Sequence, residues 1–347
     1  MQPLKPISQQ TIVITGASRG IGRETAVRCG KQGAHVVLAA RDGEALEDVA
    51  RIIESHGGRA LPVVTDVSRF DDVMRLAERA AEYFGGIDTW VNNAAVSLYG
   101  RFEEVPLEDF HRVIDVNFYG QVYGCRAALP YLRARGGALI CVGSALSDRA
   151  IPLQSAYCSS KHAIKALVES IRVELAMSGD DERVQVTLVK PASINTPLFD
   201  NARTFLGYRP KPVFPVYSPG VCADAIIHCA EHRERDIAVG GGAALLTTME
   251  SFAGPVLDRF FAMQPKSQQT DDPKSANAPN NLRAPLPDTR TSKGQHAGRP
   301  FSVYTWMRTR PRLTAAITGA AASALVLRSR ASHHDKHPDM HGGRRAA

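Results

Sequence analysis

A tyrosine and a lysine stand four residues apart in the stretch SAYCSSKHAIKAL (Ser155–Leu167), at Tyr157 and Lys161. Residues with this spacing share one face of a helix, so we expect the phenol and the ammonium to lie together. Ser144 ends the apolar run ALICVGS, and Asn117 lies in the helical pattern before that run. A phenol, an amine, a hydroxyl and an amide gathered in one place can move a proton to or from a bound oxygen atom. The Tyr–Lys spacing alone is common in helices, so this interpretation depends on its context.

A glycine-rich turn provides that context. The motif TGASRGIG places Gly16, Gly20 and Gly22 directly after the apolar run TIVIT and at the start of a helical pattern. Such glycines let the backbone approach a pyrophosphate closely and direct the N–H groups of a helix start toward its charge. The turn therefore predicts a dinucleotide site, with a purely structural strand-to-helix turn as the alternative.

The end of the second predicted strand indicates which dinucleotide binds. An acid at this position would bind the 2′-hydroxyl of NAD. The sequence VVLAARD has Ala39 and Ala40 there, followed by Arg41, and Arg19 lies within the glycine turn. Guanidinium groups match a 2′-phosphate bidentately, so we expect NADP(H). NAD(H) is the alternative, because Asp42 follows directly and Arg41 would then be a solvated residue at a helix start.

The elements that position these residues alternate along the chain. Predicted strands cover residues 11–15, 35–40, 60–67, 87–95, 137–144 and 184–191, and predicted helices cover residues 42–57, 70–85, 107–136 and 155–177. A further helix and strand within 223–240 and an amphipathic helix over 246–264 complete the pattern. Repeated βαβ units with right-handed crossovers form a doubly wound parallel sheet. We therefore expect an α/β Rossmann fold in a single catalytic domain, residues 1–263, with a flexible C-terminal tail.

The motifs and their order resemble those of the short-chain dehydrogenase/reductase family over residues 9–240. TGASRGIG is similar to the family's TGxxxGxG turn, the pair DV at positions 66 and 67 to its adenine-pocket pair, NNAA to its NNAG, and YCSSK to its YxxxK. VNFYG carries the helix asparagine Asn117, and VGS carries Ser144. The motif KPASINTP departs from the family's Pro-Gly form, because Ala192 follows Pro191. This departure affects the expected loop on the nicotinamide side and no catalytic group.

The resemblance implies a role for each member of the tetrad. Tyr157 would be the acid in carbonyl reduction and, as phenolate, the base in alcohol oxidation. Ser144 would bond the substrate oxygen, Lys161 would hold the nicotinamide ribose, and Asn117 would hold a water in a proton relay. A free phenol has a pKa of ~10, and lowering it by about 3 units requires roughly 4 kcal/mol of preferential phenolate stabilisation. The charges of Lys161 and an oxidised nicotinamide would provide this stabilisation.

The resemblance also implies the residues that bind the coenzyme, and it implies no metal. The implied coenzyme-binding residues are Gly16, Ser18, Arg19, Gly20, Ile21, Gly22, Arg41, Asp66, Val67, Asn93, Ala94, Tyr157, Lys161, Pro191, Ile194 and Thr196. Within the enzyme class, an NAD-dependent alcohol dehydrogenase of the same family is the alternative. A dinucleotide-binding regulator without catalysis is a second alternative, which the intact tetrad disfavours.

The segment that follows Thr196 indicates the substrate. PLFDNARTFLGYRPKPVFPVYS is rich in Leu, Phe, Tyr and Pro, where the resemblance implies a lid. Ligand pockets are mostly apolar, so we expect a lipophilic ketone or aldehyde and the corresponding alcohol. Packing within the lid, or a contact between subunits, is an equal alternative for these side chains. The resemblance implies a homo-oligomer, either a dimer or a tetramer.

The positive charge of the chain is concentrated in its C-terminal part. The net charge is +7, yet residues 264–347 hold 14 Lys and Arg against 5 Asp, whereas residues 1–263 hold 28 against 30 acidic residues. Binding of nucleic acid needs a cationic face on the folded domain, so we expect no nucleic-acid partner. The six cysteines lack CxxC spacing, and the start MQPLKPISQQ lacks an apolar run. We therefore expect free thiols, no secretory signal and a cytoplasmic location.

Composition changes at Gln264. Residues 264–300 are rich in Pro, Ser, Asn and charge and lack aromatics, which predicts a disordered linker. Residues 301–347 form a basic tail with an uncharged segment, residues 313–327, that has helical potential. As a helix, this segment would be ~22 Å long, short of the ~30 Å hydrocarbon core of a membrane. We expect it to dock on the enzyme or to be disordered, with peripheral contact to an anionic membrane surface as the alternative and a true span as the least favoured interpretation.

Overall fold

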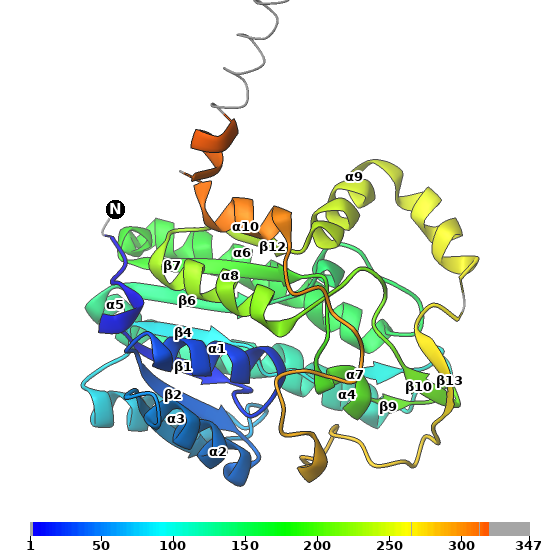
Figure 1. Cartoon of the computed structure of the whole chain (residues 1–347), viewed down its shortest axis with the longest axis horizontal. Coiled ribbons are helices and arrows are strands. Elements are labelled where there is room, and N and C mark those ends of the chain that lie inside the picture. The colour runs from blue at the N-terminus through cyan, green and yellow to red at the C-terminus, as the bar shows by residue number, and fades with distance from the viewer. Residues whose placement is uncertain (1–2, 265, 312, 319–347) are drawn as a thin grey trace, which may run out of the picture. The chain divides into compact units, whose positions relative to one another are not determined.

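A parallel sheet of seven strands forms the centre of the computed structural model, which describes residues 3–264, 266–311 and 313–318. The strand order is β12-β7-β6-β4-β1-β2-β3, and helices cover both faces (Figure 1). The strands are β1 (Thr11–Thr15), β2 (His35–Ala40), β3 (Arg59–Val64), β4 (Thr89–Asn92), β6 (Gly137–Val142), β7 (Val184–Pro191) and β12 (Asp236–Val239). The structure thus confirms the doubly wound α/β fold. Residues up to Thr305 form one compact unit, and a second unit begins at Trp306.

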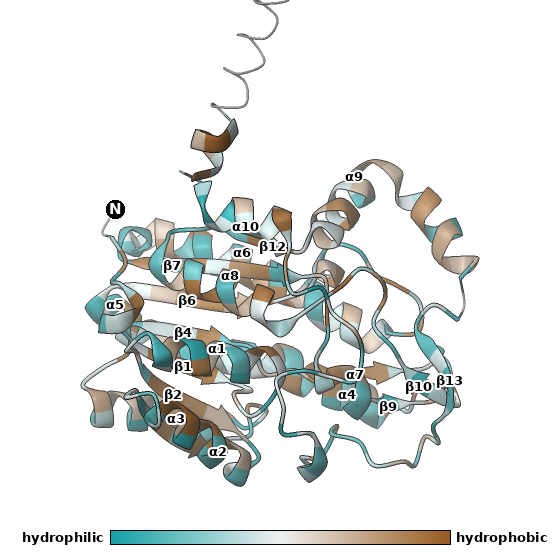
Figure 2. Cartoon of the chain, viewed as in Figure 1, coloured by the Kyte–Doolittle hydropathy of each residue, from teal (hydrophilic) through white to brown (hydrophobic). Residues whose placement is uncertain are grey.

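Six of the described helices pack on the alternating side chains of the sheet: α1 (Gly20–Lys31), α2 (Gly43–Glu54), α3 (Phe70–Phe84), α5 (Gly120–Arg135), α6 (Ser155–Ser178) and α8 (Pro219–Glu231). The other described helices are α4 (Leu107–Ile114), α7 (Pro197–Asn201), α9 (Gly241–Ala262) and α10 (Val303–Thr309). In β1, Ile12 and Ile14 join the core beneath α1, α2 and α8, whereas Val13 joins the core beneath α3, α5 and α6. Successive side chains of a strand point to opposite faces, so both faces of the sheet are buried. Figure 2 shows β2 as hydrophobic and β4 as paler, between helices that carry both hydrophobic and hydrophilic residues.

Several short elements lie outside the predicted pattern. They are β5 (Leu98–Tyr99) paired with β9 (Arg203–Thr204), β8 (Ser193–Ile194) paired with β11 (Val216–Tyr217), and β10 (Tyr208–Pro210) paired with β13 (Gln269–Pro273). The 3-10 turns are Ile7–Gln9, Ala145–Ser147, Asp180–Glu182 and Pro287–Thr289. The long helical region expected over 107–136 consists of α4, a π-helical turn at Asp115–Tyr119 and α5. The strand expected over 60–67 is β3, which ends at Val64.

The disordered linker predicted for residues 264–300 is wrong where the structure describes it. Residues 266–300, which we call the strap, run along the compact unit, and their strand β13 pairs with β10. Leu282 of the strap is fully buried, and the Lys274 ammonium donates hydrogen bonds to the carbonyl oxygens of Asp200 and Ala202 at 2.8 and 2.9 Å. The strap builds no core of its own. It is held by backbone and side-chain bonds to the rest of the unit, which composition does not report.

Two further expectations concern the surface and the tail. All six cysteines are buried free thiols, as predicted. Among the residues that the structure describes, we find no helix with the length and apolar character needed to cross a bilayer. Only residues 313–318 of the uncharged tail segment are described, and they are helical. The rest of that segment and the His-rich end lie outside the described residues.

Candidate active site

A cavity of about 310 Å³ lies at the carboxyl edge of the sheet, beside the point where the strand order reverses between β1 and β4. Open α/β sheets bind ligands at this place. Of the predicted site residues, those that line the cavity are Gly16, Ser18, Arg19, Gly20, Ile21, Arg41, Asp66, Val67, Asn93, Ala94, Ser144, Tyr157, Lys161, Pro191, Ile194 and Thr196. Gly22 and Asn117 lie outside this lining. The structure therefore brings the glycine turn and the Tyr–Lys pair into one cavity.

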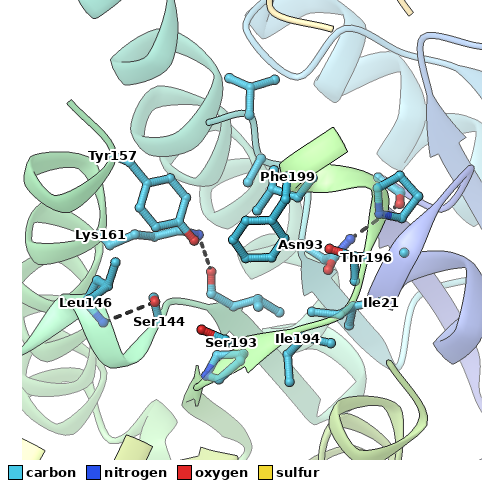
Figure 3. A pocket seen from close by; sticks show the side chains of 18 of the residues that line it. Ile21, Asn93, Ser144, Leu146, Tyr157, Lys161, Ser193, Ile194, Thr196 and Phe199 are labelled. Atoms are coloured by element: carbon cyan, nitrogen blue, oxygen red, sulfur yellow. Dashed lines mark hydrogen bonds between the residues drawn. The ribbon is translucent and has the colours of Figure 1, made fainter. Parts of the chain in front are cut away.

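The first turns of α6 carry the tyrosine and the lysine. Figure 3 shows Tyr157, Lys161 and Ser144 close together on one side of the pocket, with Phe199 and Thr196 on the other. The Tyr157 hydroxyl interacts with the side chain of Ser144, which lowers the pKa of the phenol. The Lys161 ammonium donates to the backbone carbonyl at the end of β6, Val142 O, at 2.8 Å, and lies 5.6 Å from the centroid of the Tyr157 ring. A phenol, a hydroxyl and an ammonium thus converge on one space.

Ser144 is held in place by the turn that follows β6. Its hydroxyl accepts a hydrogen bond from the Leu146 N–H at 3.1 Å, and its own N–H donates to the Ser147 hydroxyl at 3.1 Å. These reciprocal bonds form a capping box that fixes the start of the 3-10 turn. A Cβ at Gly143 would lie 2.8 Å from the Ser147 hydroxyl, so a side chain there would disturb the box.

Burial dominates the titration of Tyr157 and Lys161. Burial raises the pKa of Tyr157, and the hydrogen bond with Ser144 opposes this rise only in part. Burial also lowers the pKa of Lys161 to about 8, because a low-dielectric environment disfavours the ammonium. At neutral pH the chain therefore holds a neutral phenol beside an ammonium. The lowered phenol pKa expected from the sequence is not a property of the chain alone, since burial raises the pKa and Ser144 offsets only part of the rise.

Asn117 lies in the helical region where it was predicted, outside the cavity lining. It is fully buried in the π-helical turn between α4 and α5, a feature that often marks functional sites. Its amide oxygen accepts from the Val96 N–H at 2.8 Å, and its amide nitrogen donates to Val96 O at 3.0 Å and to the Ser160 hydroxyl at 3.1 Å. The side chain thus ties the loop after β4 to α6. These bonds position the helix that carries Tyr157.

The glycine turn has the geometry that a pyrophosphate requires. Gly16 and Gly20 have φ values of +70° and +57°, which side chains with a Cβ rarely adopt. A Cβ at Gly22 would lie 2.3 Å from Gly16 O, so this glycine allows close packing beside the cavity instead of lining it. Helix α1 begins at Gly20 without a side-chain cap; the Gly20 N–H donates to Thr291 O at 3.0 Å, and the N–H groups that follow at a helix start attract an anion. These features fit a dinucleotide phosphate.

Two guanidinium groups and one carboxylate lie at the far end of the cavity. Arg19, Arg41 and Asp42 all line it. The Asp42 carboxylate caps α2 by accepting from the Ala45 N–H at 3.1 Å, and it pairs with Arg19 at 2.7 Å. Burial raises the pKa of Asp42, but the cap bond, Arg19 and Arg290 outweigh burial and hold it below its usual value. The acid that favoured NAD(H) in the sequence is therefore a paired helix cap.

The departure at Ala192 has no conformational effect. Among the described residues other than glycine, only Leu153 has a positive φ, so the backbone at Ala192 lies in a region that alanine adopts freely. The Ala192 N–H donates to Val239 O at 2.9 Å, which joins this loop to β12.

The sequence did not predict two parts of the cavity lining: one at its substrate end, and one on the outer side of its coenzyme end. Leu246 and Phe261 of α9 and Asn281 and Pro285 of the strap also line the cavity. Helix α9 is held in place by Arg149, whose guanidinium donates to Glu250 at 2.8 Å and pairs with Asp258. The amphipathic pattern of α9 predicted a helix. That pattern did not indicate that the helix lines the cavity.

A parallel sheet with a glycine turn and a Tyr–Lys–Ser cluster in one cavity defines a Rossmann-fold oxidoreductase. Comparison with known proteins agrees, because residues 10–206 match the short chain dehydrogenase family. The chain belongs to this family, and it is an NAD(P)-dependent dehydrogenase/reductase.

Relatives and solved structures extend the comparison. The chain is 39% identical over 335 residues to the oxidoreductase YxnA of Bacillus subtilis (strain 168), an alignment that covers 94% of this chain and 93% of YxnA. It is 35% identical over 241 residues to 11-beta-hydroxysteroid dehydrogenase 1A of Arabidopsis thaliana, which covers 65% of this chain and 67% of that protein. A short chain dehydrogenase from Burkholderia cenocepacia J2315, solved in complex with NADP, is similar with a TM-score of 0.63 at 27% identity, covering 74% of this chain and 99% of that one.

Proposed function

We propose that the protein is an NADP(H)-dependent oxidoreductase that interconverts a lipophilic ketone or aldehyde and the corresponding alcohol, with Tyr157 as the acid and base. The observation that carries this proposal is the position of the Tyr157 hydroxyl. It interacts with the Ser144 side chain, belongs to a ring whose centroid is 5.6 Å from the Lys161 ammonium, and shares one cavity with the glycine turn.

The residues at the far end of the cavity support NADP(H) as the coenzyme. Arg19 and Arg41 offer guanidinium groups to a 2′-phosphate, and Asp42 is occupied as a helix cap. The start of α1 and the left-handed glycines suit the pyrophosphate. The similar dehydrogenase from Burkholderia cenocepacia was solved with NADP, which agrees with this choice. When bound, the nicotinamide would donate or accept the hydride.

The chain's own residues would handle the proton and the substrate oxygen. In reduction, Ser144 holds the carbonyl oxygen by a hydrogen bond while Tyr157 donates its phenolic proton to that oxygen as negative charge develops on it. The phenolate that remains is stabilised by the ammonium of Lys161. In oxidation the same groups act in reverse, and the phenolate accepts the alcohol proton. Asn117 contributes by fixing α6 through Ser160.

The apolar end of the cavity supports a lipophilic substrate. The side chains that line it include Leu146, Ile151, Leu198, Phe199, Leu246 and Phe261. Such a surface binds hydrocarbon and leaves few polar groups to hold a sugar. The name of the plant relative, an 11-beta-hydroxysteroid dehydrogenase, is consistent with a bulky apolar alcohol.

The predicted dimer or tetramer and the membrane contact of the tail stay predictions.

A panel of carbonyls and alcohols, run with both nicotinamide coenzymes and followed by nicotinamide absorbance, tests the proposal. We expect turnover of apolar carbonyls with NADPH well above the turnover with NADH. Turnover restricted to NADH, or restricted to small polar carbonyls, would contradict the coenzyme or the substrate assignment respectively.

A further inference from the structure

The strap crosses the outer side of the coenzyme end of the cavity. Its first part is anchored by β13 and by the buried side chain of Leu282. Its last part is anchored on the loops after β7 and β11, where the Arg299 N–H donates to Val216 O and the Ser218 N–H donates to Arg299 O, both at 2.9 Å. Between these anchors the yellow-to-orange segment of Figure 1 passes the ends of β1 and β2. The strap is therefore fixed on both sides of the groove.

The middle of the strap binds the two arginines that we assign to the 2′-phosphate. Arg41 donates to the carbonyl oxygens of Asn281 at 2.7 Å and Arg283 at 2.8 Å. Arg19 donates to the carbonyl oxygen of Leu286 and, at 3.2 Å, to the hydroxyl of Thr289. These carbonyls orient both guanidinium groups without adding a negative charge. A guanidinium has five donors: Arg41 uses two of them in these bonds, and Arg19, which also bonds Ser18 and Asp42, uses four.

The glycine turn is also joined to the strap. The Gly20 N–H donates to Thr291 O at 3.0 Å. Asn281 and Pro285 line the cavity together with Arg19, Arg41 and the other residues of the coenzyme end, so the strap bounds this space from outside and does not fill it. The strap thus has the position of a wall of the coenzyme site.

One strap side chain changes the charge of this end of the cavity. The Arg290 guanidinium lies 3.3 Å from a carboxylate oxygen of Asp42 and 2.7 Å from one of Glu44. Asp42 is 7% exposed and lines the cavity beside Arg41, whereas Glu44 is largely exposed. A carboxylate in this place repels a phosphate, which carries a charge of about −1.5 to −2. Arg290 opposes that repulsion.

We propose that the strap is a wall of the coenzyme site and that Arg290 is a specificity-determining residue, which favours the phosphorylated coenzyme by pairing with Asp42. With Arg290 in place, two guanidinium groups, those of Arg19 and Arg290, pair with the Asp42 carboxylate; without Arg290, Arg19 must share its charge between Asp42 and the phosphate. NADH lacks the 2′-phosphate, so its binding does not depend on how Arg19 and Arg290 neutralise Asp42. The inference rests on the proposed use of NADP(H).

The test measures dissociation constants for NADPH, NADH and 2′,5′-ADP by calorimetry on the full chain. Arg290→Gln should weaken NADPH and 2′,5′-ADP about tenfold and leave NADH within about twofold. Lys293→Gln is the matched control, because it removes the same charge from an exposed position of the strap and should change neither coenzyme. Adding Asp42→Asn, which keeps a good helix cap, to Arg290→Gln should restore most of the lost NADPH affinity.

Other outcomes overturn the inference. Equal weakening of NADPH and NADH would mean that Arg290 only supports the fold, which thermal melts of each variant would show directly. Tighter NADPH binding by Arg290→Gln would mean that the strap blocks the site. If the wild-type chain binds NADH better than NADPH, the proposed coenzyme fails before any variant is compared. The two failures are thereby distinguished.

Discussion

The Lys161 ammonium stands beside the Tyr157 ring, 5.6 Å from its centroid, while it donates a hydrogen bond to the Val142 carbonyl at 2.8 Å. An ammonium carries three donors, and this carbonyl uses one of them. The bond ties α6 to the end of β6, so the lysine fixes the distance between the tyrosine and the sheet edge. Its charge therefore lies in place before any substrate arrives.

The buried lysine predicts a pH dependence of stability. Burial lowers the pKa of Lys161 to about 8, whereas in an unfolded chain a lysine titrates near ~10.4. Between these values the unfolded state binds more protons than the native state, so this residue makes stability rise with pH. Lys161→Met removes the effect. Without coenzyme, we expect the wild type to gain about 3 kcal/mol of stability relative to the variant as pH rises across this window. Urea unfolding at a series of pH values measures it, and a constant difference would refute the lowered pKa.

Asn117 is predicted to be a structural link. Asn117→Ala would leave the Val96 N–H and carbonyl and the Ser160 hydroxyl without their amide partner in a buried place. We expect a loss of about 3 kcal/mol in the free energy of unfolding. Asn117→Asp keeps the acceptor for the Val96 N–H but sets a carboxylate oxygen against the Val96 carbonyl in a buried place, so it should lose at least as much. If both variants keep wild-type stability and lose only turnover, the water relay expected from the sequence would be the better account.

The ion pairs of Arg149 are predicted to support substrate binding through α9. Arg149→Met keeps an apolar stem but loses the pairs with Glu250 and Asp258, so α9 should be less well held over the cavity. We expect KM for an apolar carbonyl to rise about fivefold while the dissociation constant of NADPH stays within about twofold. Arg133→Met, which breaks a surface pair with Asp180, is the control. An equal rise of KM in both variants would count against the role of α9.

The apolar lining predicts how activity varies with substrate length. Burial of a methylene contributes about 0.8 kcal/mol, so kcat/KM for a series of straight-chain aldehydes should rise about fourfold per methylene until the cavity is filled. Steady-state rates with saturating coenzyme give this series. A flat series, or one that declines from acetaldehyde onward, would contradict a lipophilic substrate.

The sequence alone predicted the parts of the site that are built locally. Gly16 and Gly20 sit at a strand-to-helix turn, and Tyr157 and Lys161 sit one helical turn apart, so their spacing along the chain fixes their relation in space. Parallel strands bring their carboxyl ends to one edge, which is why Ser144 was also expected there. These residues carry their structural signal in a few neighbouring positions.

The remaining parts depend on contacts between distant segments. The partners of Asn117 are Val96 and Ser160, which lie 21 and 43 residues away. The strap has the composition of a disordered segment, and yet it is held because its carbonyl groups meet Arg19 and Arg41, more than 200 residues earlier. Backbone carbonyls have no sequence signature, so no local pattern indicates such a partnership. Only the fold shows which arginine faces which loop.

The central claim, that the Tyr157 hydroxyl transfers the proton, is tested most directly by Tyr157→Phe. This variant removes one oxygen and keeps the ring. Tyr99→Phe is the matched control, because Tyr99 is also buried and lines the same cavity. We measure single-turnover carbonyl reduction and NADPH binding in both. The account predicts that Tyr157→Phe loses about a thousandfold or more in rate and binds NADPH within about threefold of the wild type, while Tyr99→Phe loses less than about tenfold in rate. A Tyr157→Phe enzyme that keeps more than about a tenth of the wild-type rate would contradict it.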